Sequence, residues 1–309
     1  MGTVARPFIF AWHFLTTIPS SRTHHEPTAP ELAASMAWYP IIGLLIGGGL
    51  IVADFGLTAI LSPTVVNVLL IVLLVLLTRG LHQDGLADTL DGLAGGRTPV
   101  ERLSIMRDPR IGAIGATGLF LSLILRYAGL MALPLELRLP AVLCMPAMGR
   151  WAMVMLAWIS PYARSEGGLA APFLTHLSWR HVAISTVVLM IALAGGFGVV
   201  GACLILLAGV PIVLIGWSAC RSWFGGITGD TLGAMNEVIE IPLALPNLPK
   251  IVDPNTGIII DSSSLDPVIW RMSTSLYYHP SVCEHVSFHA SMIVRGHDKL
   301  FVNPRLMFY

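Results

Sequence analysis

Residues 182–219 form an unbroken run of 38 residues without a single Asp, Glu, Lys or Arg. As one α-helix this run would be about 57 Å long, whereas about 20 apolar residues suffice to cross a bilayer. We therefore predict two membrane spans here, with a break at the Gly195-Gly196 pair and a kink at Pro211. A helical membrane protein is favoured over a soluble one.

The overall composition supports the same class. Hydrophobic residues make up 55% of the chain and charged residues only 12%, with a mean hydropathy of +0.75, whereas a soluble domain has about a quarter charged residues. The 18 basic and 18 acidic side chains balance, which excludes a nucleic-acid binder with a basic field. The partner expected from composition is the lipid bilayer, and self-association into a homo-oligomer is compatible with it.

Four further apolar segments are long enough to cross a membrane. They are residues 36–52, 57–78, 111–133 and 139–160. With the two spans of residues 182–219 they pair as three hairpins. We therefore expect an all-α, polytopic membrane protein of about six spans.

Three hairpins return the chain to the side that it left, so the segments between them should share one side of the membrane. These segments are residues 19–35, 79–110, 161–181 and 220–241. Most of the charge lies in them, and residues 79–110 alone contain five arginines and five acids. The positive-inside rule predicts that this side is cytoplasmic.

The character of the sequence changes after residue 241. Residues 1–241 contain 13 arginines, 13 acids and no lysine, and both lysines, Lys250 and Lys299, follow later. The later part is also rich in turn-forming Pro, Asn, Asp and Ser. We place a boundary here, with a membrane domain over residues 1–241. Residues 242–309 are expected to be a linker and a short soluble segment, α/β-like or disordered.

The clearest chemical signal is a group of three acids, Asp84, Asp88 and Asp91, spaced i, i+4 and i+7. On a helix they share one stripe, and no Lys or Arg lies between them to relieve their repulsion. A divalent cation would relieve it, and Mg²⁺ usually binds one or two carboxylates together with substrate phosphates. We predict that these acids bind Mg²⁺ and act in catalysis. The alternative is an acidic first turn stabilised by the helix dipole.

Basic and polar candidates lie near these acids. Arg107 and Arg110 flank Asp108 on a turn restricted by proline, where two guanidinium groups could bind phosphate in bidentate fashion. Alternatively, both arginines extend toward water from the end of the next span. His82, two residues before Asp84, is the histidine that we place at the site.

Two later loops and two spans add further candidates. Arg164, Asp230 and Asn236 lie in the loops, although capping of a helix explains Asp230 equally well. Arg126 and Arg150 lie inside apolar spans, where a charge is costly and marks a functional candidate unless it pairs with an acid. Acids and arginines at a membrane surface together predict a Mg²⁺-dependent transferase acting on a diphosphate substrate.

Six segments resemble, in the same order, motifs of the cobalamin synthases, which are adenosylcobinamide-GDP ribazoletransferases. They are residues 14–19, 39–47, 81–93, 105–112, 161–164 and 226–234. The resemblance covers residues 7–241. It implies a multi-pass enzyme of the inner membrane that requires Mg²⁺.

The resemblance also implies the reaction. A hydroxyl of α-ribazole, or of its 5′-phosphate, attacks adenosylcobinamide-GDP, GMP leaves, and adenosylcobalamin or its 5′-phosphate forms at the end of cobalamin (vitamin B12) synthesis. Asp84, Asp88 and Asp91 are the implied metal ligands. The implied substrate contacts are His82, Arg107, Asp108, Arg110, Arg164, Asp230 and Asn236.

The C-terminal end departs from this family. The family implies a closing apolar helix after residues 226–234, whereas residues 241–246 lead into a linker. Residues 278–309 resemble the opening of a class II aldolase/adducin domain that stops before that family's zinc-binding histidines, so we expect no aldolase activity.

Other classes of protein remain open. A CDP-alcohol phosphotransferase shares the Asp-Gly-x-x-Ala opening, but Asp88 stands where that family has Arg. A transporter would line its path with Arg126 and Arg150. An inactive scaffold would use residues 242–309 to recruit a partner.

Overall fold

The computed structural model describes residues 5–20, 26–168 and 170–243, together with four short strands after residue 250. The chain divides into two units, Met1–Pro246 and Asn247–Tyr309, five residues later than the boundary that we placed after residue 241. The strands of the second unit form two antiparallel hairpins: β1 (Ile251–Val252) with β2 (Ile259–Ile260), and β3 (Ile293–Gly296) with β4 (Lys299–Val302). The rest of the aldolase/adducin-like segment lies outside the described residues.

Helices make up the described part of the first unit, which confirms the predicted all-α class. In chain order they are α1 (Ala5–Leu15), α2 (Ala29–Ser35), the 3-10 helix η1 (Met36–Trp38), α3 (Tyr39–Thr58), α4 (Pro63–Thr78), α5 (Leu81–Gly95), α6 (Pro99–Ile105), α7 (Ala113–Ala132), α8 (Leu135–Ile159), α9 (Ala171–Thr175), α10 (Trp179–Phe224) and α11 (Gly229–Leu243).

The predicted number of six spans is not confirmed. Four stretches of the described chain are long and apolar enough to cross a membrane, and they are Ala29–Thr58, α7, α8 and α10. Helix α4 adds a fifth only if it is counted together with α5, from which it is bent by 88°. The predicted apolar segments are therefore present as helices, but fewer of them meet the length of a separate span.

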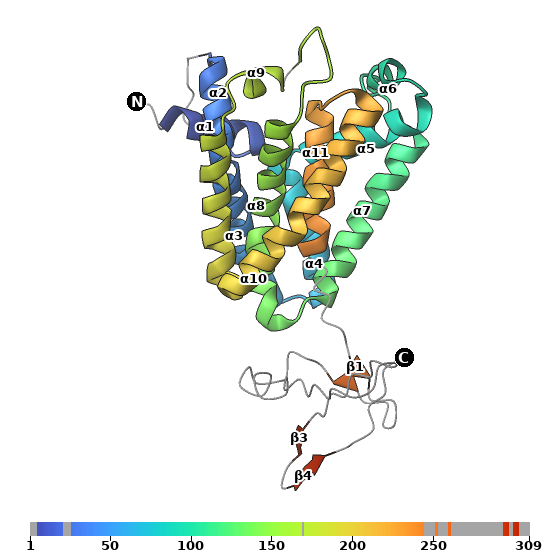
Figure 1. The fold of residues 1–309 in the computed structure, drawn as a ribbon. Coiled ribbons are helices and arrows are strands. Elements are labelled where there is room, and N and C mark those ends of the chain that lie inside the picture. Colours follow the sequence, from blue (N-terminus) through green and yellow to red (C-terminus); the bar gives the residue numbers. More distant parts are fainter. Residues whose placement is uncertain are drawn as a thin grey trace, which may run out of the picture. The chain divides into compact units, whose positions relative to one another are not determined.

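Helix α10 explains part of this difference. It runs over 46 residues, and Gly198, with φ 72° and ψ 166°, interrupts it three residues after the predicted Gly195-Gly196 break. Glycine tolerates this backbone conformation because it has no Cβ. Figure 1 shows the two arms of α10 folding back from this point. The uncharged run is thus made of two helical arms that join at a kink at Gly198, so the predicted break is present, three residues after Gly195.

The centre of the bundle is the contact between α3 and α8. Gly43 and Gly47, one helical turn apart on α3, lie against the backbone of α8 at Ala147 and Leu143, and a Cβ at either glycine would overlap it. Lipid provides no hydrophobic drive for helix association, so close packing over small residues is the main source of stability in such a bundle.

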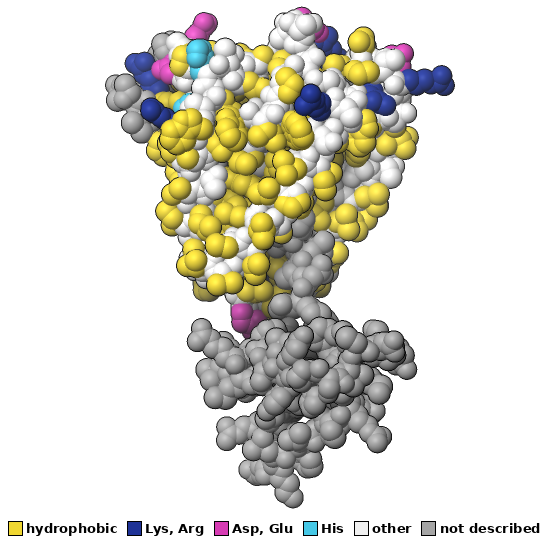
Figure 2. All heavy atoms as spheres, in the orientation of Figure 1, with side chains coloured by type: hydrophobic (Ala, Val, Ile, Leu, Met, Phe, Trp, Pro, Cys, Tyr) yellow, Lys and Arg dark blue, Asp and Glu magenta, His cyan; other side chains and the backbone are white. Residues whose placement is uncertain are grey.

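The described parts of residues 19–35, 79–110 and 161–181, three of the segments that we predicted to share one side, lie at one end of the bundle, where α1, α2, α6 and α9 are found (Figure 1). The fourth segment, residues 220–241, begins at this end, but α11 then runs along the bundle and contacts α7 and α8 inside it, so the prediction is wrong for most of this segment. Figure 2 shows charged side chains gathered at this end and hydrophobic side chains along the flanks. Trp158, Trp179 and Trp223, at helix ends on the same side, are exposed, as is typical of tryptophans at a membrane interface. We call this the charged end.

Candidate active site

Helix α5 carries the predicted acids, and a sharp turn sets its direction. Arg79 and Gly80 both have positive φ, 56° and 66°, between α4 and α5. This left-handed pair ends α4 and turns α5 by 88°, out of the axis of α4. We therefore treat α5 as lying at the charged end, outside the spanning helices. Asp84 is exposed there, and Asp88 is half-buried.

Two glycines allow α5 to approach α11 closely. A Cβ on Gly85 would lie 2.6 Å from the carbonyl oxygen of Asp230, and a Cβ on Gly233 would lie 3.2 Å from the Cα of His82. Neither space admits a side chain without movement of the backbone. The contact places the first turn of α11, with Asp230, beside the acids of α5.

The surroundings of Asp88 show which charged groups the fold brings together. The pKa of Asp88 is raised from its usual value to about 6, first by burial and then by the negative charges of Asp84, Asp230 and Asp91, while Arg164 acts in the opposite direction. Repulsion among carboxylates in a half-buried setting disfavours the charged form. Three of these acids, Asp84, Asp88 and Asp230, are called the acidic group below.

Asp230 is held in place by its neighbours. Its Oδ2 atom accepts hydrogen bonds from Arg164 Nη2 and from Thr228 Oγ1, both at 3.2 Å. Burial raises its pKa, and the contacts with Arg164 and Thr228 offset part of that rise. Arg164 itself comes from the loop after α8, which is joined to the loop before α11 by a bridge between Tyr162 and Ile227.

Asp91 has a different role from the one that its spacing predicts. Its two carboxylate oxygens accept hydrogen bonds from the backbone N–H groups of Gly112, at 2.7 Å, and Gly115, at 2.8 Å. Gly112 is the N-cap residue of α7 and Gly115 lies in its first turn. Asp91 thus caps α7 from another helix, where a negative charge is favoured by the helix dipole.

The acidic group fits a hard divalent cation by its chemistry. No three His, Cys, Asp or Glu side chains within the described ranges lie close enough to hold a metal ion by themselves. Neighbouring carboxylates nevertheless suit an ion that takes one or two of them and completes its shell with phosphate oxygens and water.

The predicted phosphate arginines divide into two places. Arg107 forms an ion pair with Glu166, on the loop that also carries Arg164. Arg110 is paired instead with Asp108 in its own turn, with Nη2 to Oδ2 at 2.7 Å, and these contacts lower the pKa of Asp108 to about 2. Arg107 is therefore tied to the loop that carries Arg164, whereas Arg110 is held within its own turn.

Arg110 lies on a groove of about 550 Å³ that starts at Asp91 and is otherwise mostly apolar. The groove is lined by Asp91, Ala94, Gly95, Ile105, Asp108, Arg110, Ile111, Gly112, Ala113 and Ile114. It lies between the last part of α5, the end of α6 and the start of α7.

His82 and Asn236 are not at the acidic group. Both side chains are 1% exposed and lie among other protein side chains inside the bundle. His82 Nδ1 is 3.5 Å from Arg150 Nη2, and Asn236 Nδ2 donates to Glu240 Oε1 at 2.9 Å. The prediction that these two residues contact the substrate is corrected, because a side chain with so little exposed surface has no access to a ligand.

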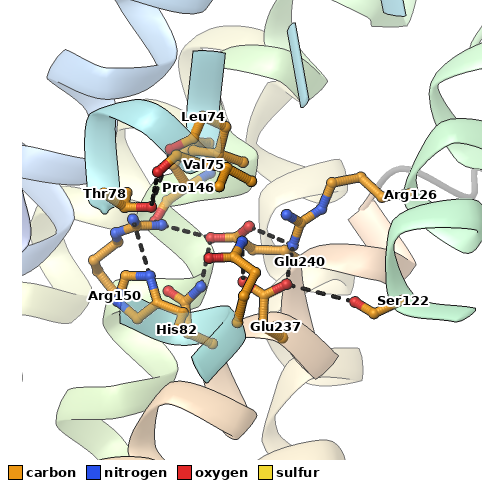
Figure 3. A network of polar contacts seen from close by, with 12 residues as sticks. Leu74, Val75, Thr78, His82, Ser122, Arg126, Pro146, Arg150, Glu237 and Glu240 are labelled. Carbon is orange, nitrogen blue, oxygen red and sulfur yellow. Dashed lines mark hydrogen bonds and ion pairs between the residues drawn. The ribbon is translucent and has the colours of Figure 1, made fainter. Parts of the chain in front are cut away.

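Both residues belong to a buried polar network (Figure 3). Its members come from α5, α7, α8 and α11, and they are His82, Gln83, Ser122, Arg126, Arg150, Asn236, Glu237 and Glu240. Arg126 Nη2 lies 3.1 Å from Glu237 Oε2 and 2.8 Å from Glu240 Oε2, while Arg150 Nη1 lies 2.5 Å from Glu240 Oε1. Two arginines thus face two glutamates. This agrees with the alternative interpretation of Arg126, in which it pairs with an acid.

Sequence reasoning did not single out Glu237 as a partner, although a signal was present. Arg126 and Arg150 are two cations in apolar helices, and Glu237 and Glu240 are i and i+3 on the last helix. Because a buried charge requires a partner, two intramembrane arginines call for two nearby acids. The sequence alone does not show that α11 packs against α7 and α8, so it does not identify which acids are the partners.

Comparison with known proteins gives one consistent family. A model of the family described as cobalamin-5-phosphate synthase matches residues 7–246. Curated relatives named adenosylcobinamide-GDP ribazoletransferase include that of Syntrophobacter fumaroxidans, 39% identical over 75% of this chain and 94% of its own length. Those of Desulforamulus reducens and Pseudomonas fluorescens are 38% and 36% identical, over 68% and 76% of this chain and 84% and 96% of theirs. No solved structure matches the chain.

Proposed function

Because the chain belongs to the cobalamin-5-phosphate synthase family, we propose that it is a membrane enzyme of cobalamin synthesis, an adenosylcobinamide-GDP ribazoletransferase. One observation in the fold carries the assignment to a site. Asp84, Asp88 and Asp230 meet beside Arg164 at the charged end, where α11 packs on α5. Negative groups for a cation and a guanidinium for phosphate oxygens are the parts that phosphoryl transfer needs.

The proposed reaction is a displacement at phosphorus. A hydroxyl of α-ribazole, or of its 5′-phosphate, attacks the phosphorus that is linked to cobinamide, the bond to the GMP oxygen breaks, and the hydroxyl proton passes to a carboxylate. Asp88, with its pKa raised to about 6, is the carboxylate best matched to accept a proton near neutral pH. Arg164 and Arg107 bind and orient the diphosphate oxygens.

We propose Mg²⁺ as the cofactor. Asp84 and Asp230 would hold the ion, with Asp230 in the place that the spacing assigned to Asp91, because both oxygens of Asp91 are engaged by α7. This leaves Asp88 free to accept the proton. When bound, Mg²⁺ would neutralise charge on the diphosphate and on the leaving group. The charged end would face the cytoplasm of an inner membrane, given the five arginines of residues 79–110.

The experiment is to incubate membranes that contain the protein with adenosylcobinamide-GDP, MgCl₂ and either α-ribazole or its 5′-phosphate. We expect GMP and a cobalamin product in a one-to-one ratio, and loss of both on adding EDTA. Comparing the two nucleophiles identifies the preferred one. Absence of product with both would refute the proposal, and release of CMP from CDP-diacylglycerol would assign the alternative CDP-alcohol phosphotransferase activity.

A further inference from the structure

We propose that the buried polar network positions the acidic group, with Gln83 as its connecting residue. Gln83 Nε2 on α5 donates a hydrogen bond to Glu237 Oε1 on α11 at 3.1 Å. Through this bond, the network fixes the position of α5 along α11, and with it the distance between the acids of α5 and Asp230. The inference rests on the proposed function, since it concerns the same site.

The bond lies close to both halves of the site. Gln83 directly precedes Asp84 in the chain, and Glu237 follows Asp230 by seven residues on the same helix. Residues seven apart lie on nearly the same face of a helix, two turns from each other. One hydrogen bond therefore links a point beside Asp84 to a point on the helix face that carries Asp230.

Glu237 is itself immobilised from two other helices. It is 1% exposed, its Oε2 accepts from Arg126 on α7, and Arg126 also pairs with Glu240, which Arg150 on α8 holds in turn. Moving Glu237 would break a buried ion pair, which is strongly unfavourable where no water replaces the partner. Helix α11 is therefore a fixed reference for α5.

The space around the network leaves little room for another register. A Cβ on Gly149 of α8 would lie 2.7 Å from Glu240 Oε1 and would overlap Asn236. One to two turns earlier on nearly the same face of α11, Gly233 lies against the backbone of α5 at His82. The glycines let α8 and α5 pack closely on successive turns of α11, and the polar contacts select one alignment among the close-packed ones.

A second buried ion pair provides a control for plain stability. At the other end of α8, Arg138 pairs with both oxygens of Asp54, at 3.0 and 2.7 Å, and with Asn67 at 2.7 Å. This clamp joins α8 to α3 and α4, and it includes no residue of α5 or α11. If buried ion pairs acted only on stability, disturbing the clamp would have the same consequences as disturbing the Gln83 contact.

The test compares Gln83→Leu, Ser122→Ala and Arg138→Gln in the full-length protein, purified in detergent. Ser122→Ala is the closest match, because Ser122 Oγ contacts the same Glu237 carboxylate at 3.5 Å, but from α7. For each variant, steady-state kinetics give kcat, the KM values of both substrates and the Mg²⁺ concentration at half-maximal rate. Electron paramagnetic resonance measures Mn²⁺ binding, and thermal unfolding gives the melting temperature.

For Gln83→Leu we expect kcat to fall roughly 10- to 100-fold, since a misplacement of about 1 Å has an effect of this size. Half-maximal activity should require more Mg²⁺, Mn²⁺ should bind more weakly, and the KM of α-ribazole should be unchanged. Ser122→Ala should behave as the wild type. Arg138→Gln should lower the melting temperature and leave the metal dependence unchanged.

The inference is overturned if Gln83→Leu keeps the wild-type metal dependence, or if Arg138→Gln shifts it equally. Should Gln83→Leu fail to fold, Gln83→Asn, which is too short to reach Glu237, is measured instead. An inactive wild type would refute the proposed function, whereas an active wild type with an unaffected Gln83 variant would refute only the positioning role.

Discussion

Nη2 of Arg164 lies 3.2 Å from Oδ2 of Asp230, and this contact joins the loop after α8 to the first turn of α11. Arg164 is the cation that opposes the mutual repulsion of the acidic group. Nε of the same guanidinium is buried and has no acceptor among the described residues. Because arginine binds phosphate oxygens well, we propose that Arg164 contacts the diphosphate as well as Asp230.

Replacing Arg164 by Gln should weaken binding of the diphosphate substrate. We expect the KM of adenosylcobinamide-GDP to rise about 10- to 100-fold, in line with the loss of a hydrogen bond to a charged group, with the KM of α-ribazole unchanged. Steady-state kinetics of GMP release measure both. Arg180→Gln is the matched control, because Arg180 is exposed beside Trp179 at the same end. Equal KM values in the two variants would contradict a role for Arg164 in phosphate binding.

Asp84 and Asp91 should separate function from stability. Asp91→Ala leaves two N–H groups at the start of α7 without their acceptors, so we expect a loss of about 1–2 kcal/mol of stability, with reduced but measurable activity. Asp84, which is exposed, should show the reverse: Asp84→Asn should abolish GMP release without lowering the melting temperature. Full activity of Asp84→Asn would refute the assignment of the acidic group.

Buried and exposed ion pairs should differ in their effect on stability. Arg126→Met leaves Glu237 and part of Glu240 as buried, unpaired charges, and we expect a loss of about 3–5 kcal/mol. Arg107→Met removes a pair with Glu166 in which both side chains are about half exposed, where the expected loss is about 0–1 kcal/mol. Unfolding in detergent by denaturant measures both. Similar losses would show that the network interior is hydrated.

Adjacent glycines on α3 should respond differently to a methyl group. Gly47→Ala places a Cβ into the backbone of α8 at Leu143, and the resulting overpacking should lower stability by about 1–3 kcal/mol. At Gly48 no described atom lies within 4 Å of the new Cβ, so Gly48→Ala should be neutral or stabilising by about 0.5–1 kcal/mol. Thermal unfolding tests the pair, and a destabilising Gly48→Ala would point to a partner on that face.

The sequence predicted the helical membrane class and the presence of Asp84 and Asp88 on one face of a helix. Spacing alone gives the second result, because i, i+4 residues share a helix face whatever surrounds them. Asp91 obeys the same spacing, but its oxygens turn to Gly112 and Gly115. Periodicity describes one helix at a time and does not show which helix end lies opposite.

The same limit applies to the network and to the spans. Arg126 and Glu240 are 114 residues apart in the chain, so the cost of a buried cation predicts that an acid is present but not which one. Hydropathy located the run and predicted two spans with a break at Gly195-Gly196, and the structure has two arms joined at Gly198, three residues after Gly195. As one stretch α10 counts as a single candidate span. The partners of the buried arginines and the number of spans depend on tertiary packing, which the local pattern of apolar and charged residues does not determine.

The order of charges along the chain has a consequence for assembly. Arg126 and Arg150 lie on α7 and α8, whereas Glu237 and Glu240 lie on α11, the last helix that the structure describes in this unit. During synthesis two cations enter the bundle well before their counterions are made. Both counterions and Asp230 come from α11, so the same helix neutralises the interior and supplies an acid of the site. An incompletely assembled chain therefore holds no complete acidic group.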